Sequence, residues 1–446
     1  MSNQTAYLER LRSLSNRLVA LQRPIRILDA IKWPAELEAR FIASGGRELP
    51  RLSKDFYQNQ RLAFDTDAVY QHLKELKSDV RRDLGRGDAL GRILLATIDQ
   101  YQIVIELLKA RGTDQFGHFS KLLYGSAQDK IRGDRKTLRE MGERLCHLFS
   151  LPAVEHLNRP HTSNIHAEEA VNTLHERMDS YFGSGEVRVE ISDDIVSDAS
   201  AGGDCIKINR RALFSELDLQ VLEVHEGWVH VGTTLNGRQQ PWATWLSVGS
   251  PRITAIQEGM AVLIETLTFS SFPQRARRIS DRVVAVDLAE QGADFCQVYQ
   301  HFLARGVSQH DSYRVTQRVF RGGTLTGGSV FTKDISYVKG FVENVNFIRS
   351  AIQSGVPEII PMLFVGKVTL DDLPVLYERY LEGVIAGPKH LPPMFRDLNG
   401  LYVWFGFSSG MGLMNIARVQ QHFSKLFQKM PASTPLYLNK SDVDFD

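Results

Sequence analysis

The sequence contains few cysteines, and their positions argue against the folds and cofactors that depend on cysteine. Only Cys146, Cys205 and Cys296 occur among 446 residues, far apart and in no C-x-x-C spacing. This pattern argues against a disulfide scaffold, a cysteine-ligated zinc site and an iron–sulfur cluster. We therefore expect a protein of a reducing compartment.

The sequence also lacks a surplus of charge of either sign. Lysine and arginine number 53, and aspartate and glutamate number 52. No global field therefore draws the chain towards nucleic acid or an anionic membrane, and we expect neither as a partner. This balance applies to the whole chain and does not exclude local patches of charge on the surface.

Long apolar segments are missing as well. The N-terminal segment MSNQTAYLERLRSLSNRLVALQ is charged throughout and has no secretory-signal core. The longest apolar run, LYVWFGFSSGMGLM from Leu401, is too short and too rich in glycine and serine to span a bilayer. We predict a cytoplasmic protein, in which the aromatic string YVWFGF from Tyr402 packs in the core or walls a pocket.

The remaining composition, 43% hydrophobic and 24% charged, is typical of a globular protein, and the length suits two or three domains. Helical spacing of apolar residues dominates both ends of the chain, while strand-like alternation occurs only in the middle. We predict an α+β, mostly helical fold. Its parts are a helical N-terminal lobe (1–165), a zincin-like catalytic core with a small sheet and two metal-bearing helices (166–345), and a helical C-terminal part that completes the cleft (346–446).

Two strands are predicted in the middle part, VRVEIS (187–192) and CIKIN (205–209). The acidic string between them, SDDIVSDASAGGD, lacks the spacing of a calcium-binding loop, and we interpret it as a solvated turn. Four histidines lie just before or near this region without a convincing ligand spacing. We expect them at the surface or between lobes: His156, His161, His166 and His175.

The string VHEGWVHVG, from Val224 to Gly232, lies in the next predicted helix. Its His225, Glu226 and His230 are residue types of a hydrolytic zinc site, which needs three protein ligands, an open position for water and a base. On a regular helix, residues five apart point roughly 140° away from each other. A π-helical turn with i→i+5 hydrogen bonds brings them together. The spacing therefore predicts a widened turn between the histidines, near Gly227.

A later predicted helix, ITAIQEGMAVLIETL, places Glu258 among apolar residues. Burying a carboxylate is costly unless it has a partner, which would be either a metal ion or a buried arginine. On residue types alone the two histidines could also be unrelated, because a single H-E-x-x-x-H match is a weak signal.

The strings HEGWVH, QEGMA (257–261), SDASAGGDCIKIN, RVFRGG and FTKDISYVKGF together resemble the QEGLA-motif proteins, a family linked to flavohaemoglobin expression. Its eukaryotic members resemble the microtubule-associated tyrosine carboxypeptidases. Met260 stands where the motif has leucine, a nearly volume-conserving change. The resemblance covers most of residues 160 to 420. It implies one Zn²⁺ ion held by His225, His230 and Glu258, with Glu226 as general base, and a carboxypeptidase acting on the C-terminal tail of a peptide or protein.

Such an enzyme must also hold its substrate. Edge strands beside an active helix commonly pair with a substrate backbone, and GGDCIKIN, with Gly203 and Cys205, is either that strand or an ordinary core strand. A C-terminal carboxylate calls for basic residues. Candidates flank a glycine-rich interval, RGGTLTGGSVFTKD, which lacks a phosphate-loop ending and is expected to be a loop: Arg318, Arg321, Lys333 and Lys339. Tyr337 is a candidate oxyanion stabiliser. For each of these side chains the alternative is a solvated surface position.

The sequence is also compatible with two other functions. The first is a non-catalytic regulator of gene expression in which the metal only joins two helices. That structural site would need a fourth protein ligand, and no cysteine or histidine nearby in the sequence offers one. The second is an amide hydrolase acting on a non-protein substrate. The natural substrate and the oligomeric state stay open as well.

Overall fold

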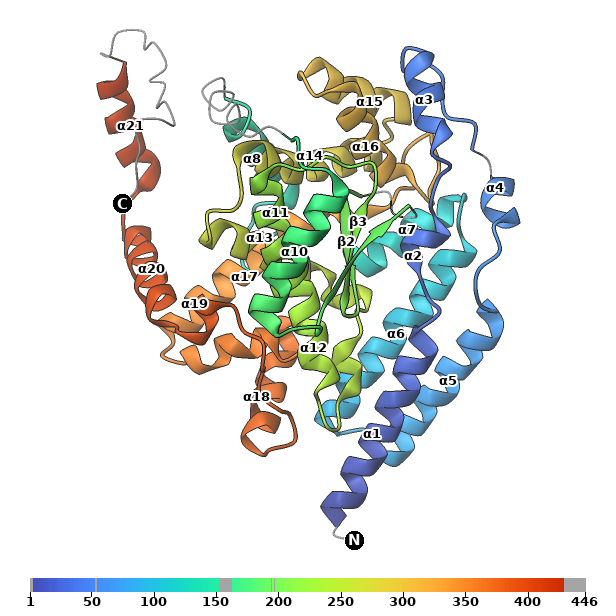
Figure 1. Ribbon diagram of the computed structural model, residues 1–446, viewed down its shortest axis with the longest axis vertical. Coiled ribbons are helices and arrows are strands. Elements are labelled where there is room, and N and C mark those ends of the chain that lie inside the picture. Colours follow the sequence, from blue (N-terminus) through green and yellow to red (C-terminus); the bar gives the residue numbers. More distant parts are fainter. Residues whose placement is uncertain (1–2, 53, 152–162, 194, 196, 429–446) are drawn as a thin grey trace.

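Most of the chain is helical, and one three-stranded sheet lies near its middle (Figure 1). This agrees with the predicted α+β, mostly helical class. His166 and His175 are exposed, as expected, whereas His156 and His161 lie outside the described residues. The computed structural model describes residues 3–52, 54–151, 163–193, 195 and 197–428.

The N-terminal helices form one side of the molecule, with α1, α5 and α6 packed against one another (Figure 1). In α1, Leu11, Leu14 and Leu18 recur at helical spacing and are buried on one face. The Asp65 side chain accepts two backbone N–H bonds and fixes where α5 begins. The helices of this side are α1 (Asn3–Gln22), α2 (Ile27–Ala30), α3 (Glu36–Ala43), α4 (Lys54–Asn59), α5 (Thr66–Asp83), α6 (Ala89–Lys109) and α7 (Asp114–Tyr124). The next helix, α8 (Leu138–Leu148), packs instead against α14 (Pro273–Glu290).

The sheet follows helix α10 (Ala167–Phe182) and has the strand order β1-β3-β2. Strand β3 pairs with β1 in parallel and with β2 in antiparallel fashion. Two strands match the prediction, β1 (Arg188–Ser192) and β3 (Cys205–Asn209). The third, β2 (Ala199–Gly202), lies inside the string that we interpreted as a turn, so that interpretation is wrong.

Of the two alternatives for GGDCIKIN, the structure shows the ordinary core strand and not the edge strand. Cys205 pairs with Arg188 on one side and with Gly202 on the other, so β3 is the central strand and its backbone groups are already paired. Gly203 lies in the turn between β2 and β3, with a positive φ of 67°. The edge strand that faces the predicted active helix is β2.

The chain after the sheet contains the two helices predicted to carry metal ligands. One long helix is built from α11 (Glu216–Leu222), η1 (Glu223–Val231) and α12 (Gly232–Arg238), and the other is α13 (Thr254–Leu267). Helix α13 packs closely along α17. The elements that follow α12 are η2 (Thr244–Ser247), η3 (Pro251–Ile253), α13, α14 (Pro273–Glu290), α15 (Phe295–Ala304), α16 (Gln309–Phe320), η4 (Thr332–Ile335) and α17 (Ser336–Gln353).

Two glycines set the distance between α13 and α17. A Cβ on Gly259 would lie 1.9 Å from the carbonyl carbon of Gly340, and one on Gly340 would lie 1.6 Å from the Ala255 oxygen. Only glycine at both positions allows the two backbones to touch. The contact brings the first turn of α17 and the residues just before it close to Glu258.

The C-terminal part packs on α12 and α17. The side chains of Asn236 in α12 and of Gln240, two residues after α12 ends, bond backbone groups between Phe364 and His390, which holds this segment against the long helix. The elements are η5 (Pro357–Phe364), η6 (Leu370–Asp372), α18 (Leu373–Leu381), α19 (Pro393–Arg396), α20 (Asn399–Gly410), η7 (Met411–Leu413) and α21 (Ile416–Phe427).

Buried apolar side chains form one large core and one small one. The large core includes residues from Leu11 to Phe405, and the small core lies between α10, the sheet and the long helix. The aromatic string from Tyr402 does not pack in the core as expected, because Phe405 is buried but Trp404 and Phe407 are 53% and 79% exposed. Within the described part of the chain, no helix is long and apolar enough to cross a membrane.

Candidate metal centre

The widened turn predicted between the two histidines is present. Residues Glu223–Val231 form a π-helix inside the long helix, with regular α-helix on both sides. The ring centroids of His225 and His230 lie 4.9 Å apart, so both imidazoles are on the same side of the helix. Gly227 has a packing role here, since a Cβ would lie 2.6 Å from the sulfur of Met178 in α10.

His225, His230 and Glu258 come together where the π-helix contacts α13. Glu258 Oε2 is 3.7 Å from the Nε2 atom of each histidine, and the three donor atoms lie within 4.8 Å of one another. Ligands bound to zinc at about 2.1 Å with tetrahedral angles are about 3.4 Å apart. The donor types and their separations therefore fit a zinc ion. Among the described residues, no fourth histidine, cysteine or carboxylate joins this group.

The second nitrogen of His225 is held by a buried ion pair. His225 Nδ1 lies 2.6 Å from Glu265 Oε1, and Arg275 donates two hydrogen bonds of 2.6 Å to the Glu265 carboxylate. Glu265 is fully buried. Burial raises its pKa, but Arg275 and His225 outweigh that effect and lower the pKa to about 2. An ionised Glu265 accepts a hydrogen bond from the Nδ1–H of His225, which orients the ring so that Nε2 faces Glu258.

The surroundings of His225, His230 and Glu258 stabilise positive charge where the three possible metal-ligand atoms meet. Burial lowers the pKa of His225, but hydrogen bonds to Glu258 and Glu265 outweigh it and raise the pKa to about 10. Burial likewise raises the pKa of Glu258, while Lys333 and the two histidines lower it well below its ordinary value. A group of donor atoms with these preferences suits a cation.

Lys367 contacts the end of the π-helix through hydrogen bonds. Its ammonium group lies 2.8 Å from the backbone oxygen of His230 and 2.9 Å from both Thr233 Oγ1 and Gln257 Oε1. Three acceptors match its three N–H groups. Burial lowers the pKa of Lys367 to about 7, against the opposing effect of Glu258 and Glu226. Gln257, the residue before the candidate ligand Glu258, is thereby joined through Lys367 to the His230 carbonyl at the end of the π-helix.

The candidate base Glu226 faces the edge strand. The backbone N–H of Ala201 in β2 donates a 2.8 Å hydrogen bond to Glu226 Oε2. A two-residue turn makes Gly202 and Cys205 a hydrogen-bonded pair, so the N–H and C=O of Ala201 point away from β3. The free edge of the sheet therefore borders the candidate site.

Two of the predicted basic residues are engaged in ion pairs. Arg318 makes a bidentate pair with buried Asp334, and Lys333 donates a 2.8 Å hydrogen bond to Glu258 Oε1. Burial lowers the pKa of Lys333, but Glu258 and Tyr337 outweigh this effect and raise it. Lys333 thus contacts a candidate metal ligand directly. Lys339 lies elsewhere, in a pocket of about 220 Å³ beside the start of α13.

Arg321 and Arg282 are two further basic side chains of this region, and neither makes an ion pair within 4 Å in the described structure. Arg321 is 9% exposed, and its buried Nε has no hydrogen-bond partner in the described structure. Burial, with repulsion from Arg318, lowers its pKa to about 10 and also lowers the pKa of Arg282. The Arg282 guanidinium lies 4.3 Å from the ring centroid of Tyr337. Arg321 and Arg282 repel each other electrostatically and are the candidates for binding an anionic group.

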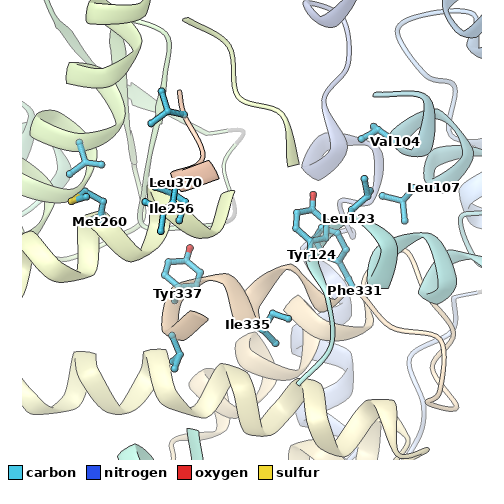
Figure 2. Close-up of a cluster of buried hydrophobic side chains, with 14 of the residues drawn as sticks. Val104, Leu107, Leu123, Tyr124, Ile256, Met260, Phe331, Ile335, Tyr337 and Leu370 are labelled. Carbon is cyan, nitrogen blue, oxygen red and sulfur yellow. The ribbon is translucent and has the colours of Figure 1, made fainter. Parts of the chain in front are cut away.

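The Tyr337 ring lies beside the Arg282 guanidinium in the first turn of α17, the helix that packs along α13. It is 8% exposed and belongs to the same buried cluster as Ile256 and Met260 of α13, as Figure 2 shows. Lys333 Nζ is 5.6 Å from its ring centroid. Six cations and four carboxylates interact electrostatically around this region. They are Arg275, Arg282, Arg318, Arg321, Lys333 and Lys367, with Glu226, Glu258, Glu265 and Asp334.

Sequence reasoning missed Glu265, Arg275, Arg282, Gln257 and Lys367. One signal was available for Arg282, a charge on the same helical face as buried Ile279, Val283 and Val286. Glu265 offered a similar signal at the apolar end of α13. Lys367 follows α13 by about a hundred positions, and nothing in its local sequence indicates a contact with the π-helix.

Among the comparisons with known proteins, the family model agrees with the motifs. A search of curated proteins finds no match. Among solved structures, the crystal structure of the putative lipoprotein from Colwellia psychrerythraea has 11% sequence identity and a TM-score of 0.41, covering 78% of this chain and 72% of that chain. The family model described as microtubule-associated tyrosine carboxypeptidase matches residues 39–412, a span that includes the π-helix, α13 and α17. The chain therefore belongs to the microtubule-associated tyrosine carboxypeptidase family.

Proposed function

We propose that this protein is a zinc-dependent metallocarboxypeptidase that removes residues from the C-terminal tail of a peptide or protein. The π-helix carries the proposal, because it brings two histidines five residues apart to one carboxylate and leaves Glu226 beside them. A regular helix would point the histidines away from each other. The family match supports the carboxypeptidase direction, and its description names tyrosine as the residue removed.

In this proposal His225, His230 and Glu258 hold the zinc ion. When bound, the ion would lower the pKa of a water molecule and polarise the scissile carbonyl. Glu226 accepts the proton of the attacking water and passes it to the leaving amine. Its bond from the Ala201 N–H fixes one carboxylate oxygen and leaves the other for the proton. The absence of a fourth donor among the described residues favours an open, catalytic site over a structural one.

The substrate is held by backbone and by charge. We assign backbone pairing to the outer edge of β2, in place of the central strand β3 that carries Cys205. The C-terminal carboxylate is assigned to Arg321 and Arg282, the guanidinium groups whose charge is not compensated by a bidentate partner. The Tyr337 hydroxyl is assigned to the oxyanion that forms at the scissile carbonyl.

The test combines zinc analysis with peptides that differ at the C-terminus. The wild type should bind one zinc ion, release single C-terminal residues, and spare peptides whose C-terminus is amidated. Glu226→Gln should keep the zinc ion and lose about 100-fold or more in kcat, because an amide cannot accept the proton.

Glu223→Gln is the matched control, since Glu223 lies in the same π-helix but pairs with Arg177. It should keep both zinc and activity. Full turnover by zinc-loaded Glu226→Gln would reject the mechanism. Cuts inside the peptides, or equal cleavage of amidated ones, would reject the carboxypeptidase.

A further inference from the structure

Exposed apolar side chains are concentrated at the C-terminal end of the described chain. Of 22 large hydrophobic residues exposed in the structure, 12 lie between residues 399 and 428. We call residues 399–428 the C-terminal apolar surface. Scattered exposed hydrophobics need no explanation, but a concentration of this kind marks an interaction site. Its members are Tyr402, Val403, Trp404, Phe407, Met411, Leu413, Met414, Ile416, Val419, Phe423, Leu426 and Phe427.

Helix α20 presents two different faces. Leu401 and Phe405 are buried, and the helix contacts α17. Val403, Gly406, Phe407 and Gly410 recur at spacings of three and four on the opposite face. A Cβ at Gly406 or Gly410 would meet nothing within 4 Å. The outer face therefore combines protruding side chains with open hollows, and no charged residue lies on this helix.

Helix α21 is amphipathic but lies apart from the body of the molecule (Figure 1). Ile416, Val419, Phe423 and Leu426 lie along one stripe, while Arg418 and Lys425 lie on the opposite side. All twelve of its residues are exposed. A lone helix of this length is marginal in water, so its apolar stripe needs a partner.

We propose that the C-terminal apolar surface binds the same surface of a second copy of this chain and forms a two-fold symmetric dimer. The face of α20 is self-complementary, because Phe407 and Val403 of one copy can enter the hollows at Gly406 and Gly410 of the other. Covering roughly 80 Å² on each of the twelve side chains gives about 1,000 Å² per copy, above the about 800 Å² per partner of a stable interface.

The charges of this surface favour a second copy over a lipid membrane. Residues 399–428 contain only two cations, Arg418 and Lys425, and no acidic residue. Binding to anionic lipid commonly involves about four to eight clustered basic residues. Without that attraction, apolar packing between copies is the better way to cover the surface. The proposal is independent of zinc and of peptidase activity.

The test is the mass of the full-length protein in solution, measured by sedimentation equilibrium. At about 10 µM, the wild type should have twice the 50.4 kDa chain mass, as expected for an interface of this area. Phe407→Glu and Phe423→Glu should weaken the dimer by about 100-fold or more, since a buried interface carboxylate has no partner. Gly406→Leu should weaken it by filling a hollow. Leu381→Glu, at an exposed leucine outside the surface, should leave the mass unchanged.

Circular dichroism would establish that each variant is folded. A wild type that stays monomeric at about 50 µM would overturn the proposal, as would a dimer that all three surface variants leave intact. Vesicles of phosphatidylcholine with and without phosphatidylglycerol form a second arm of the test. Co-sedimentation of monomeric wild type with either vesicle would assign the surface to lipid and reject the dimer.

Discussion

At the residue scale, Glu265 controls which nitrogen of His225 faces Glu258. It is fully buried, bonded to Arg275 and close to His225 Nδ1. Its low pKa keeps it ionised at neutral pH, so it stays a hydrogen-bond acceptor. A neutral amide at this position could present its NH₂ group to the ring and favour the tautomer with the proton on Nε2. That tautomer cannot bind a metal through Nε2.

Glu265→Gln should therefore weaken zinc binding by about 10- to 100-fold, the range typical of residues that orient a ligand. Competition with a zinc-binding dye measures this without any substrate. Asp281→Asn is the matched control, because Asp281 is also buried but bonds Cys146 away from the site. Equal zinc affinity in wild type and Glu265→Gln would mean that Glu265 has no orienting role.

At the element scale, the π-helix depends on contacts that come from outside it. Lys367 Nζ and Thr234 Oγ1 each donate a 2.8 Å hydrogen bond to the His230 carbonyl oxygen, and Gln257 Oε1 accepts a hydrogen bond from the same Lys367 ammonium group. Without these donors, the turn would gain by returning to i→i+4 bonding. The two histidines would then separate.

Lys367→Met should therefore lower zinc affinity by about 10-fold or more. It should raise thermal stability or leave it unchanged, because the ammonium group is costly to bury and methionine is not. Zinc titration and thermal unfolding of the apoprotein measure the two effects. Lys339→Met, a change on α17 away from the His230 carbonyl, should alter neither. A parallel fall of affinity and stability would indicate a general packing defect instead.

The parts of the fold that sequence could predict are those with strong periodicity. Helix α13 and strands β1 and β3 have clear apolar patterns, and the five-residue histidine spacing requires the π-helix. Strand β2 reads Ala-Ser-Ala-Gly, which carries almost no strand signal, and its pairing with β3 forms it.

The partners within the site could not be predicted, because they depend on contacts between distant segments. Nothing local indicates that Lys333 meets Glu258 or that Arg318 is neutralised by Asp334. The aromatic string from Tyr402 shows the same limit, since its composition suggests burial but its exposed face has no covering element in the described structure.

At the scale of the whole molecule, the candidate site is built by segments from across the family match. The long helix, α13, α17 and the Lys367 segment each contribute a side chain, and α12 anchors the segment that follows Phe364. The backbone contact between Gly259 and Gly340 fixes two of these elements relative to each other. Such a site forms only when the whole core is folded.

The surplus of cations in this site has a consequence for how fast a substrate arrives. The chain as a whole is nearly neutral, but five arginine and lysine side chains and Lys367, whose pKa is lowered to about 7, lie here with four carboxylates. A cleft of one sign speeds the diffusional encounter with ligands of the opposite sign, and salt screens this effect. Raising ionic strength from about 20 to 300 mM should lower kcat/KM roughly tenfold for a peptide with an acidic tail. For a peptide with a neutral tail of the same length, kcat/KM should change little over the same range of ionic strength. An equal salt dependence of kcat/KM for both peptides would show that the cations do not accelerate substrate association.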